Sequence, residues 1–123
     1  MTEALSQPLT PAVFALLMAL IDGERHGYAL MADVERITEG LIRLGPGTLY
    51  RSLQRMRVDG LIEELDDDRG APVADRRSER RRSYRITRRG RAAARAEARR
   101  LAVLMAAAVQ CGLVEVDVEE EDV

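Results

Sequence analysis

The sequence predicts a mainly α-helical fold of the α+β class, in which three short helices precede a two-stranded hairpin and a longer helix follows it. Three observations support this expectation. Apolar residues recur every three or four positions in four segments, two short alternating runs separate the third segment from the fourth, and glycine or proline marks most boundaries. A chain of 123 residues has the size of one domain.

The first two helices are predicted from their start signals and apolar faces. Thr10-Pro11 favours a helix start, because threonine accepts a hydrogen bond from a free amide and proline fits the first helical position. This helix is expected to end at Asp22-Gly23, with an apolar face formed by Val13, Leu16, Leu17, Leu20 and Ile21. The second helix is expected over residues 27–38, with Leu30, Val34 and Ile37 on one face.

The third helix is predicted between Gly45-Pro46 and Gly60, a glycine placed where a left-handed cap ends a helix. Its buried stripe is expected to consist of Leu49, Leu53 and Met56. Its polar side chains fall on the other faces, and Tyr50 falls at the flank of the stripe.

Two strands and a last helix complete the prediction. The alternating runs 61–65 and 82–87 are expected to pair across a long polar loop, residues 66–81. Thr87 can cap a helix over residues 88–112, whose small and apolar residues are spaced four and three apart in a narrow seam: Ala94, Ala98, Leu101, Leu104, Met105 and Ala108. This seam is interpreted as a dimer interface, and packing against the first helix is the alternative.

Three helices followed by a hairpin is the element order of a winged helix-turn-helix domain. The expected organisation is therefore a DNA-binding domain over residues 10–87, a dimerisation helix over 88–112 and an acidic, disordered tail over 113–123. The third helix would be the recognition helix, and the hairpin would be the wing.

The charge distribution points to a polyanionic partner. Residues 76–100 contain twelve arginines and two acidic residues, whereas residues 63–75 contain six acidic residues and one arginine. Residues 115–123 contain six more acidic residues, so the overall net charge of −2 hides a strongly basic block.

Four segments together resemble the PadR family of bacterial transcriptional regulators. They are "LLMAL", "HGYAL", "GPGTLYRSLQRMRVDGLIEE" and "RRSYRITRRGR", and the resemblance covers about residues 12–101. It implies a winged-helix DNA-binding domain, dimerisation through the C-terminal helix, and repression that a small ligand or other effector relieves. The single helix after the wing is similar to the short-tailed subgroup.

The expected DNA contacts come from the third helix, the start of the second helix and the wing. Arginine and glutamine can make paired contacts to guanine and adenine edges, and arginines near the wing can bind phosphate. The candidate residues are Tyr28, Thr48, Tyr50, Arg51, Gln54, Arg55, Arg80, Arg81 and Arg82. For Tyr28, packing in the core and a phosphate contact are both open. His26 is expected to cap the second helix rather than bind an ion.

A dimer would bind a pseudo-palindromic operator in double-stranded DNA, because a twofold axis repeats the recognition helix. A small apolar effector is expected between the first and the last helix, at Met18, Leu101, Leu104 and Met105. The chain differs from the family in its long wing loop with an acidic leading limb, and it has no tryptophan for an aromatic sandwich.

Other functional classes are weakly supported. The single histidine and single cysteine, and the absence of a phosphate-binding loop or catalytic triad, argue against an enzyme, a metal site and a cofactor. The longest nearly uncharged run, residues 8–21, is too short for a membrane span, and a cytoplasmic location is expected. The remaining alternative is a winged-helix protein-interaction module without specific DNA binding.

Overall fold

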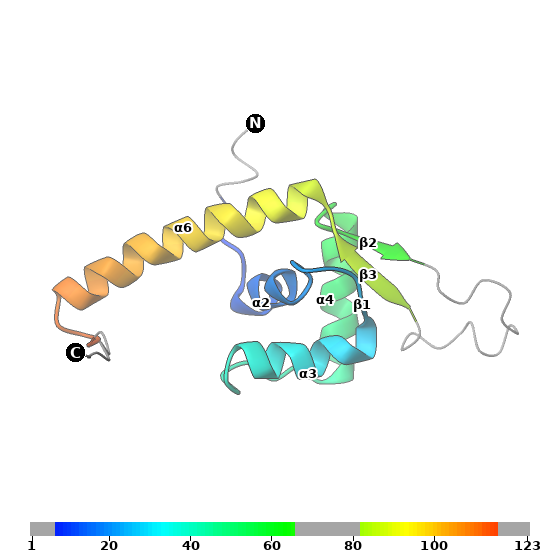
Figure 1. The fold of residues 1–123 in the computed structure, drawn as a ribbon, viewed down its shortest axis with the longest axis horizontal. Helices are drawn as coiled ribbons and strands as arrows, with labels where there is room; N and C mark the ends of the chain where they lie inside the picture. Colours follow the sequence, from blue (N-terminus) through cyan, green and yellow to red (C-terminus); the bar gives the residue numbers. More distant parts are fainter. Residues whose placement is uncertain (1–6, 66–81, 116–123) are drawn as a thin grey trace, which may run out of the picture.

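The computed structural model describes residues 7–65 and 82–115, which form four helices in the predicted order and a three-stranded antiparallel sheet (Figure 1). The helices are α2 (Pro11–Ala19), α3 (Gly27–Ile37), α4 (Pro46–Val58) and α6 (Arg88–Gln110), and the strands are β1 (Arg25–His26), β2 (Ile62–Leu65) and β3 (Ser83–Ile86). The expectation of a mainly helical α+β fold is confirmed.

Helix α2 lies at the centre, between α6 on one side and α3 on the other (Figure 1). Its side chains are apolar on all faces, and Leu16 and Leu17 are completely buried. The hydroxyl of Thr10 accepts a hydrogen bond from the amide of Val13 at 3.1 Å, so the predicted cap is confirmed. The helix ends at Ala19, and Ile21, which we expected on the apolar face, lies beyond this end and is exposed.

Helices α3 and α4 pack beside α2 and form the helix-turn-helix. The predicted apolar stripes are confirmed, since the core includes Leu30 and Val34 of α3 and Leu49, Leu53 and Met56 of α4. Thr38 fixes the connector between the two helices. Its hydroxyl donates to the carbonyl of Val34 at 2.8 Å and accepts from the amide of Ile42 at 3.1 Å.

The sheet contains one strand more than the sequence predicts. Strand β1 has only two residues, and it pairs with β3 so that Arg25 lies opposite Tyr84 and His26 opposite Ser83. Strand β2 pairs with the other edge of β3, which gives the order β1-β3-β2. A two-residue strand shows no alternation, and its pairing depends on a partner 57 residues away along the chain.

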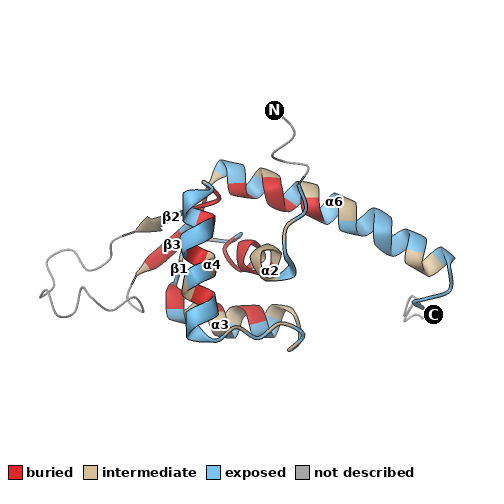
Figure 2. Cartoon of the chain, turned by 180° about the vertical axis from the view of Figure 1, so that it is seen from behind, coloured by how far each residue is buried: buried red, intermediate tan, exposed pale blue. Residues whose placement is uncertain are grey.

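Helix α6 starts against the sheet and then leaves the body of the molecule (Figure 1). The hydroxyl of Thr87 accepts from the amide of Gly90 at 3.0 Å, which confirms the predicted cap. Figure 2 shows buried residues in the first half of α6 and almost continuous exposure in the second half. The predicted wing loop, residues 66–81, and most of the predicted acidic tail lie outside the described residues.

The segment before α2 is attached to α6 through a buried carboxylate. Glu97 of α6 is 5% exposed, and its Oε1 accepts from the amide of Leu9 at 3.0 Å. The same oxygen forms an ion pair with Arg100, which also donates to the carbonyl of Gln7 at 3.3 Å. Helix α6 is therefore fixed to the body at both the sheet and the N-terminal segment.

Candidate nucleic-acid interface

The outer face of α4 presents a group of polar side chains to solvent. Thr48, Arg51, Gln54 and Arg55 are exposed, while the opposite face of the helix is buried in the core. The Arg51 guanidinium lies 3.4 Å from the hydroxyl of Thr48, so these two side chains are neighbours one turn apart. Arg55 pairs with Asp59 at 3.4 Å near the end of the helix. Four predicted DNA-contact residues are thus brought to one accessible helix.

The two tyrosines differ in accessibility. Tyr28, at the start of α3, is 54% exposed, and its ring stacks on His26 with centroids 5.8 Å apart. Tyr50 is half-buried, and its hydroxyl oxygen is buried against the start of α3, where a Cβ added to Gly27 would lie 2.8 Å from it. Tyr50 therefore sets the distance between the two helices of the helix-turn-helix.

Backbone and side-chain hydrogen bonds connect the start of α3 to the wing. The amide of Gly27 donates to the carbonyl of Arg82 at 2.9 Å, and His26 Nδ1 is hydrogen-bonded to Ser83 Oγ at 3.2 Å. His26 occupies the N-cap position of α3, but its side chain does not cap the helix as we expected. It bonds to the wing instead, because β1 holds it opposite Ser83.

Acidic residues of β2 hold the arginines at the base of the wing. Arg82 and Arg57 both approach the carboxylate of Glu64, at 3.2 and 3.6 Å, and Arg85 pairs with Glu63 at 2.7 Å. The hydrogen bond to Glu63 raises the pKa of Arg85 above its ordinary value, because the carboxylate favours the charged guanidinium. Arg80 and Arg81 lie outside the described residues.

Arg57 belongs to this cluster, although the sequence analysis did not select it. It follows Tyr50 by seven residues, which places both side chains on the flank of α4 that faces the sheet and α3. The seven-residue spacing between Tyr50 and Arg57 could have identified Arg57. It would also have required the prediction that the strand after α4 packs beside this helix.

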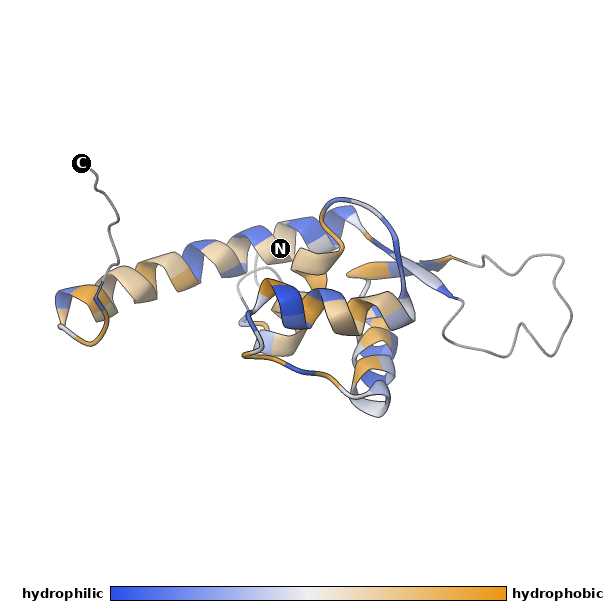
Figure 3. Ribbon diagram, turned by 60° about the horizontal axis from the view of Figure 1, so that its bottom comes forward, coloured by the Kyte–Doolittle hydropathy of each residue, from blue (hydrophilic) through white to orange (hydrophobic). Residues whose placement is uncertain are grey.

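The predicted dimer residues divide into two groups along α6. Ala94 is buried in the core of the subunit, whereas Ala98 is exposed and Ala108 is half-buried. Leu101, Leu104 and Met105 are 40%, 58% and 53% exposed, on the part of α6 that projects from the body. Figure 3 shows that this projecting part is largely apolar.

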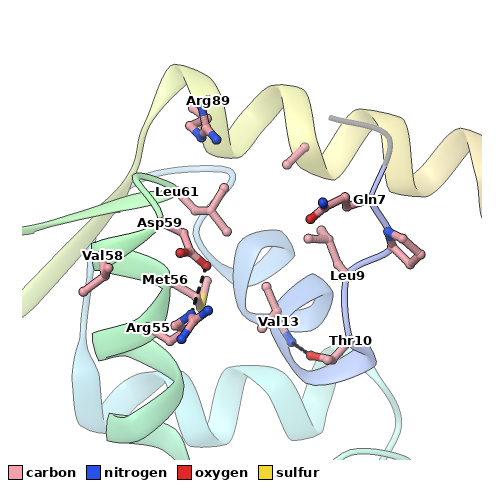
Figure 4. A pocket seen from close by; sticks show the side chains of 12 residues that line it. Gln7, Leu9, Thr10, Val13, Arg55, Met56, Val58, Asp59, Leu61 and Arg89 are labelled. Carbon is pink, nitrogen blue, oxygen red and sulfur yellow. Dashed lines mark hydrogen bonds and ion pairs between the residues drawn. The ribbon is translucent and has the colours of Figure 1, made fainter. Parts of the chain in front are cut away.

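The predicted effector residues do not line the cavity drawn in Figure 4. Met18 is half-buried on α2, and the other three residues lie on the exposed part of α6. The cavity has a volume of about 590 Å³ and lies between the N-terminal segment, α2, the end of α4 and the start of α6. It is lined by Gln7, Pro8, Leu9, Thr10, Val13, Arg55, Met56, Val58, Asp59, Leu61, Arg89 and Ala93.

Among residues 7–65 and 82–115, no group of three or more histidine, cysteine or acidic residues is arranged to hold a metal ion. Within the same ranges, none of the helices combines the length and the apolar character that crossing a bilayer requires. Cys111 is exposed near the end of α6.

A helix-turn-helix followed by a small antiparallel sheet, with an exposed polar face on its second helix, defines the winged helix-turn-helix class. Residues 16–96 match the family described as transcriptional regulator PadR-like, and the chain belongs to this family. The resemblance expected from the sequence motifs is therefore confirmed. The family consists of transcriptional regulators rather than enzymes, which implies regulation through DNA binding.

Solved structures share this fold. The chain is similar to a transcriptional regulator from Clostridium thermocellum, with a TM-score of 0.64 and 21% identity over 80% of this chain and 86% of that one. It is also similar to the protein smu.1704 from Streptococcus mutans, with a TM-score of 0.56 and 16% identity over 90% and 98% of the two chains.

A sequence relative comes from Streptomyces fradiae. It is an uncharacterized 37.1 kDa protein in transposon Tn4556, 41% identical over 56 residues. The match covers 46% of this chain but only 16% of the length of that protein.

Proposed function

We propose that the protein is a dimeric, sequence-specific DNA-binding regulator that represses transcription in the cytoplasm until a small ligand or other effector releases it from the operator. The exposed polar face of α4 is the observation that carries this proposal. Core side chains hold the opposite face of the helix, so its orientation is fixed before DNA binds.

In this proposal α4 enters the major groove and discriminates between bases. Arg51 and Arg55 can each make paired hydrogen bonds to guanine, and Gln54 can do so to adenine. Tyr50 supports this helix by packing on the start of α3, and Thr48 lies beside Arg51 at the entry to the groove. Each paired base contact contributes about 1–3 kcal/mol of discrimination.

Phosphate contacts are assigned to the start of α3 and to the wing. Tyr28 is exposed next to the first amides of α3, and Arg82 directly precedes β3, the return strand of the wing. Arg80 and Arg81 directly precede Arg82 in the sequence and add positive charge to the same basic stretch of the chain. Such contacts set the register of the protein on the duplex without selecting a sequence.

The projecting part of α6 supports the proposed dimer. Leu101, Leu104 and Met105 follow one another at helical spacing on a segment that the other described residues leave exposed. Large apolar side chains exposed together on one helix are typical of an interaction surface. A twofold pair of α6 helices would repeat α4 in two half-sites, one helical turn or a multiple apart, in a pseudo-palindromic operator.

The effector is proposed to bind where α2 and α6 meet in this dimer. Met18 lies half-buried on α2, which packs on α6, and Leu101, Leu104 and Met105 continue the apolar surface along α6. Methionine side chains adapt readily to apolar ligands. A ligand bound there would favour one of two dimer geometries and so change the separation of the recognition helices.

Binding-site selection from a random duplex library tests the central proposal. We expect an enriched pseudo-palindromic sequence and a discrete, salt-sensitive shift of that duplex in a gel. Arg51→Ala should weaken binding roughly tenfold or more, because it removes a paired base contact and leaves the core intact.

The matched control is Arg36→Ala, which removes an exposed arginine from the far end of α3, where it pairs with Asp33. This variant should bind the selected duplex like the unmodified protein. Failure to enrich any sequence would contradict the proposal and favour the protein-interaction module. Equal affinity of Arg51→Ala and Arg36→Ala would contradict the assignment of a base contact to Arg51.

A further inference from the structure

One carboxylate connects the proposed recognition helix to the wing. Glu64 of β2 lies 3.6 Å from the guanidinium of Arg57 on α4 and 3.2 Å from that of Arg82, the residue before β3. The Glu64 side chain is 27% exposed, and those of Arg57 and Arg82 are 43% and 37% exposed. Two arginines from different elements therefore share one partly covered acidic partner.

The register of the sheet explains why Glu64 occupies this position. Glu64 lies opposite Tyr84, and Ile62 lies opposite Ile86, so these four side chains share one face of the sheet. Tyr84, Ile62 and Ile86 are buried, and this face is the one next to α4. Glu63 and Arg85 point to the opposite, exposed face and pair with each other.

Arg57 lies on α4 and Arg82 directly precedes β3, and the proposed function places both the helix and the wing against DNA. A guanidinium that is bound to a carboxylate must either leave it or divide its N–H donors between the carboxylate and the DNA before it can bind a phosphate oxygen. The negative charge of Glu64 also repels the duplex at the junction of helix and wing. Exposed ion pairs are weak, so exchange of the partner is possible but has a cost.

We infer that Glu64 competes with DNA phosphates for Arg57 and Arg82. This competition lowers the affinity of the protein for DNA of any sequence. This inference rests on the proposed function and assigns a new role within it. Glu64 does this by occupying Arg57 and Arg82, and the α4–wing junction becomes a stronger phosphate site only when the carboxylate is neutralised.

The expected effect can be stated for binding to a duplex of scrambled sequence. Each phosphate that an arginine newly neutralises makes the slope of log K against log salt steeper by about 0.9. An arginine that no longer has to break a partly exposed ion pair should raise the affinity for DNA by up to about fivefold. Glu64→Gln should therefore raise the affinity roughly three- to twentyfold at low salt, and the slope should become steeper by about one to two.

Fluorescence anisotropy of a labelled scrambled duplex over a potassium chloride series provides the measurement. Glu63→Gln is the matched control, because it makes the same change of charge one residue away on the opposite face of the same strand. It should shift affinity and slope much less than Glu64→Gln. Circular dichroism and thermal unfolding of both variants establish that they remain folded.

A second set of variants traces the gain to the paired arginines. Adding Arg57→Gln or Arg82→Gln to Glu64→Gln should remove part of the increase in affinity and return the slope toward that of the unmodified protein. Equal effects of Glu64→Gln and Glu63→Gln, with the unmodified protein binding DNA, would overturn the inference and leave the proposed function standing. Absence of DNA binding by every variant would contradict the proposed function itself.

Discussion

Gly90 and Gly47 are both helical, but Gly90 has no room for a side chain whereas Gly47 does. Substitution by alanine tests both positions. A Cβ added to Gly90, at the start of α6, would lie 2.1 Å from the carbonyl oxygen of Leu61, so this glycine allows α6 to pack directly on the backbone that leads into β2. A Cβ added to Gly47, in the first turn of α4, would meet only a guanidinium nitrogen of Arg51 at 3.5 Å.

We predict that alanine has opposite effects at these positions. Gly90→Ala should lower the free energy of unfolding by roughly 1–3 kcal/mol, because α6 must move away from Leu61. Gly47→Ala should raise it by about 0.5 kcal/mol, since alanine is the better helix former. Urea denaturation measures both, and a stable Gly90→Ala variant would show that α6 can shift at no cost.

Single residues also show what the sequence could predict. The caps at Thr10 and Thr87 and the buried stripe of α4 depend on local spacing, so sequence patterns identify them. The burial of the Tyr50 hydroxyl depends on the missing Cβ of Gly27, 23 positions earlier in the chain. Helical periodicity gives the face of a residue but not the segment that packs on it, so Arg57 was not selected as a wing contact.

At the scale of elements, Thr87 is the single residue between β3 and α6. Its hydroxyl accepts from the amide of Gly90 at 3.0 Å and donates to the carbonyl of Gly60 at 2.7 Å. The first bond caps α6, and the second attaches this junction to the turn that ends α4, where Gly60 has the predicted left-handed conformation with φ of +79°. One side chain thus holds the sheet, α4 and α6 together.

Removing this hydroxyl should cost more than removing an isolated cap. We predict that Thr87→Ala lowers the free energy of unfolding by roughly 2 kcal/mol, because a cap and a second hydrogen bond are lost together. Thr10→Ala removes only the cap of α2 and should cost about 1 kcal/mol or less. Equal losses for the two variants in chemical denaturation would show that the bond to Gly60 adds nothing.

The sequence predicted the longer elements well and missed the shortest strand. Helices α2, α3, α4 and α6 each bury side chains at helical spacing, a pattern visible in the sequence. Strand β1 is held by its register with β3, by the bond between His26 and Ser83, and by the amide of Gly27. These long-range contacts are made by the backbone and by one pair of polar side chains, and the spacing of apolar residues does not encode them.

At the scale of the whole molecule, the first half of α6 completes the core, and the second half is not covered by any other part of the described residues, 7–65 and 82–115 (Figure 2). Ala94 therefore serves the fold of one subunit, although the spacing of the seam includes it. The exposed apolar residues from Leu101 onward are the ones that the proposed dimer would bury.

We predict that Leu101→Asp converts the proposed dimer into monomers. A twofold interface contains the substitution twice, so the loss of two buried leucines corresponds to roughly 3 kcal/mol or more, or at least a hundredfold in the dissociation constant. Size-exclusion chromatography with light scattering measures this change.

Leu41→Asp is the control for this experiment. It places the same charge at a leucine that is 86% exposed on the connector between α3 and α4, and it should leave the mass unchanged. A dimer that persists in Leu101→Asp would place the interface elsewhere on the chain.

The short passage from β3 to α6 has a mechanical consequence for such a pair of subunits. The Thr87 hydroxyl is hydrogen-bonded to both Gly60 and Gly90, and Thr87 is the single residue between β3 and α6. The wing strands and α6 are therefore expected to move together as one rigid unit. Any change in the crossing angle of two α6 helices would swing both wings along with it. The span between the two wings on the duplex would then be set far from the DNA, where the helices cross.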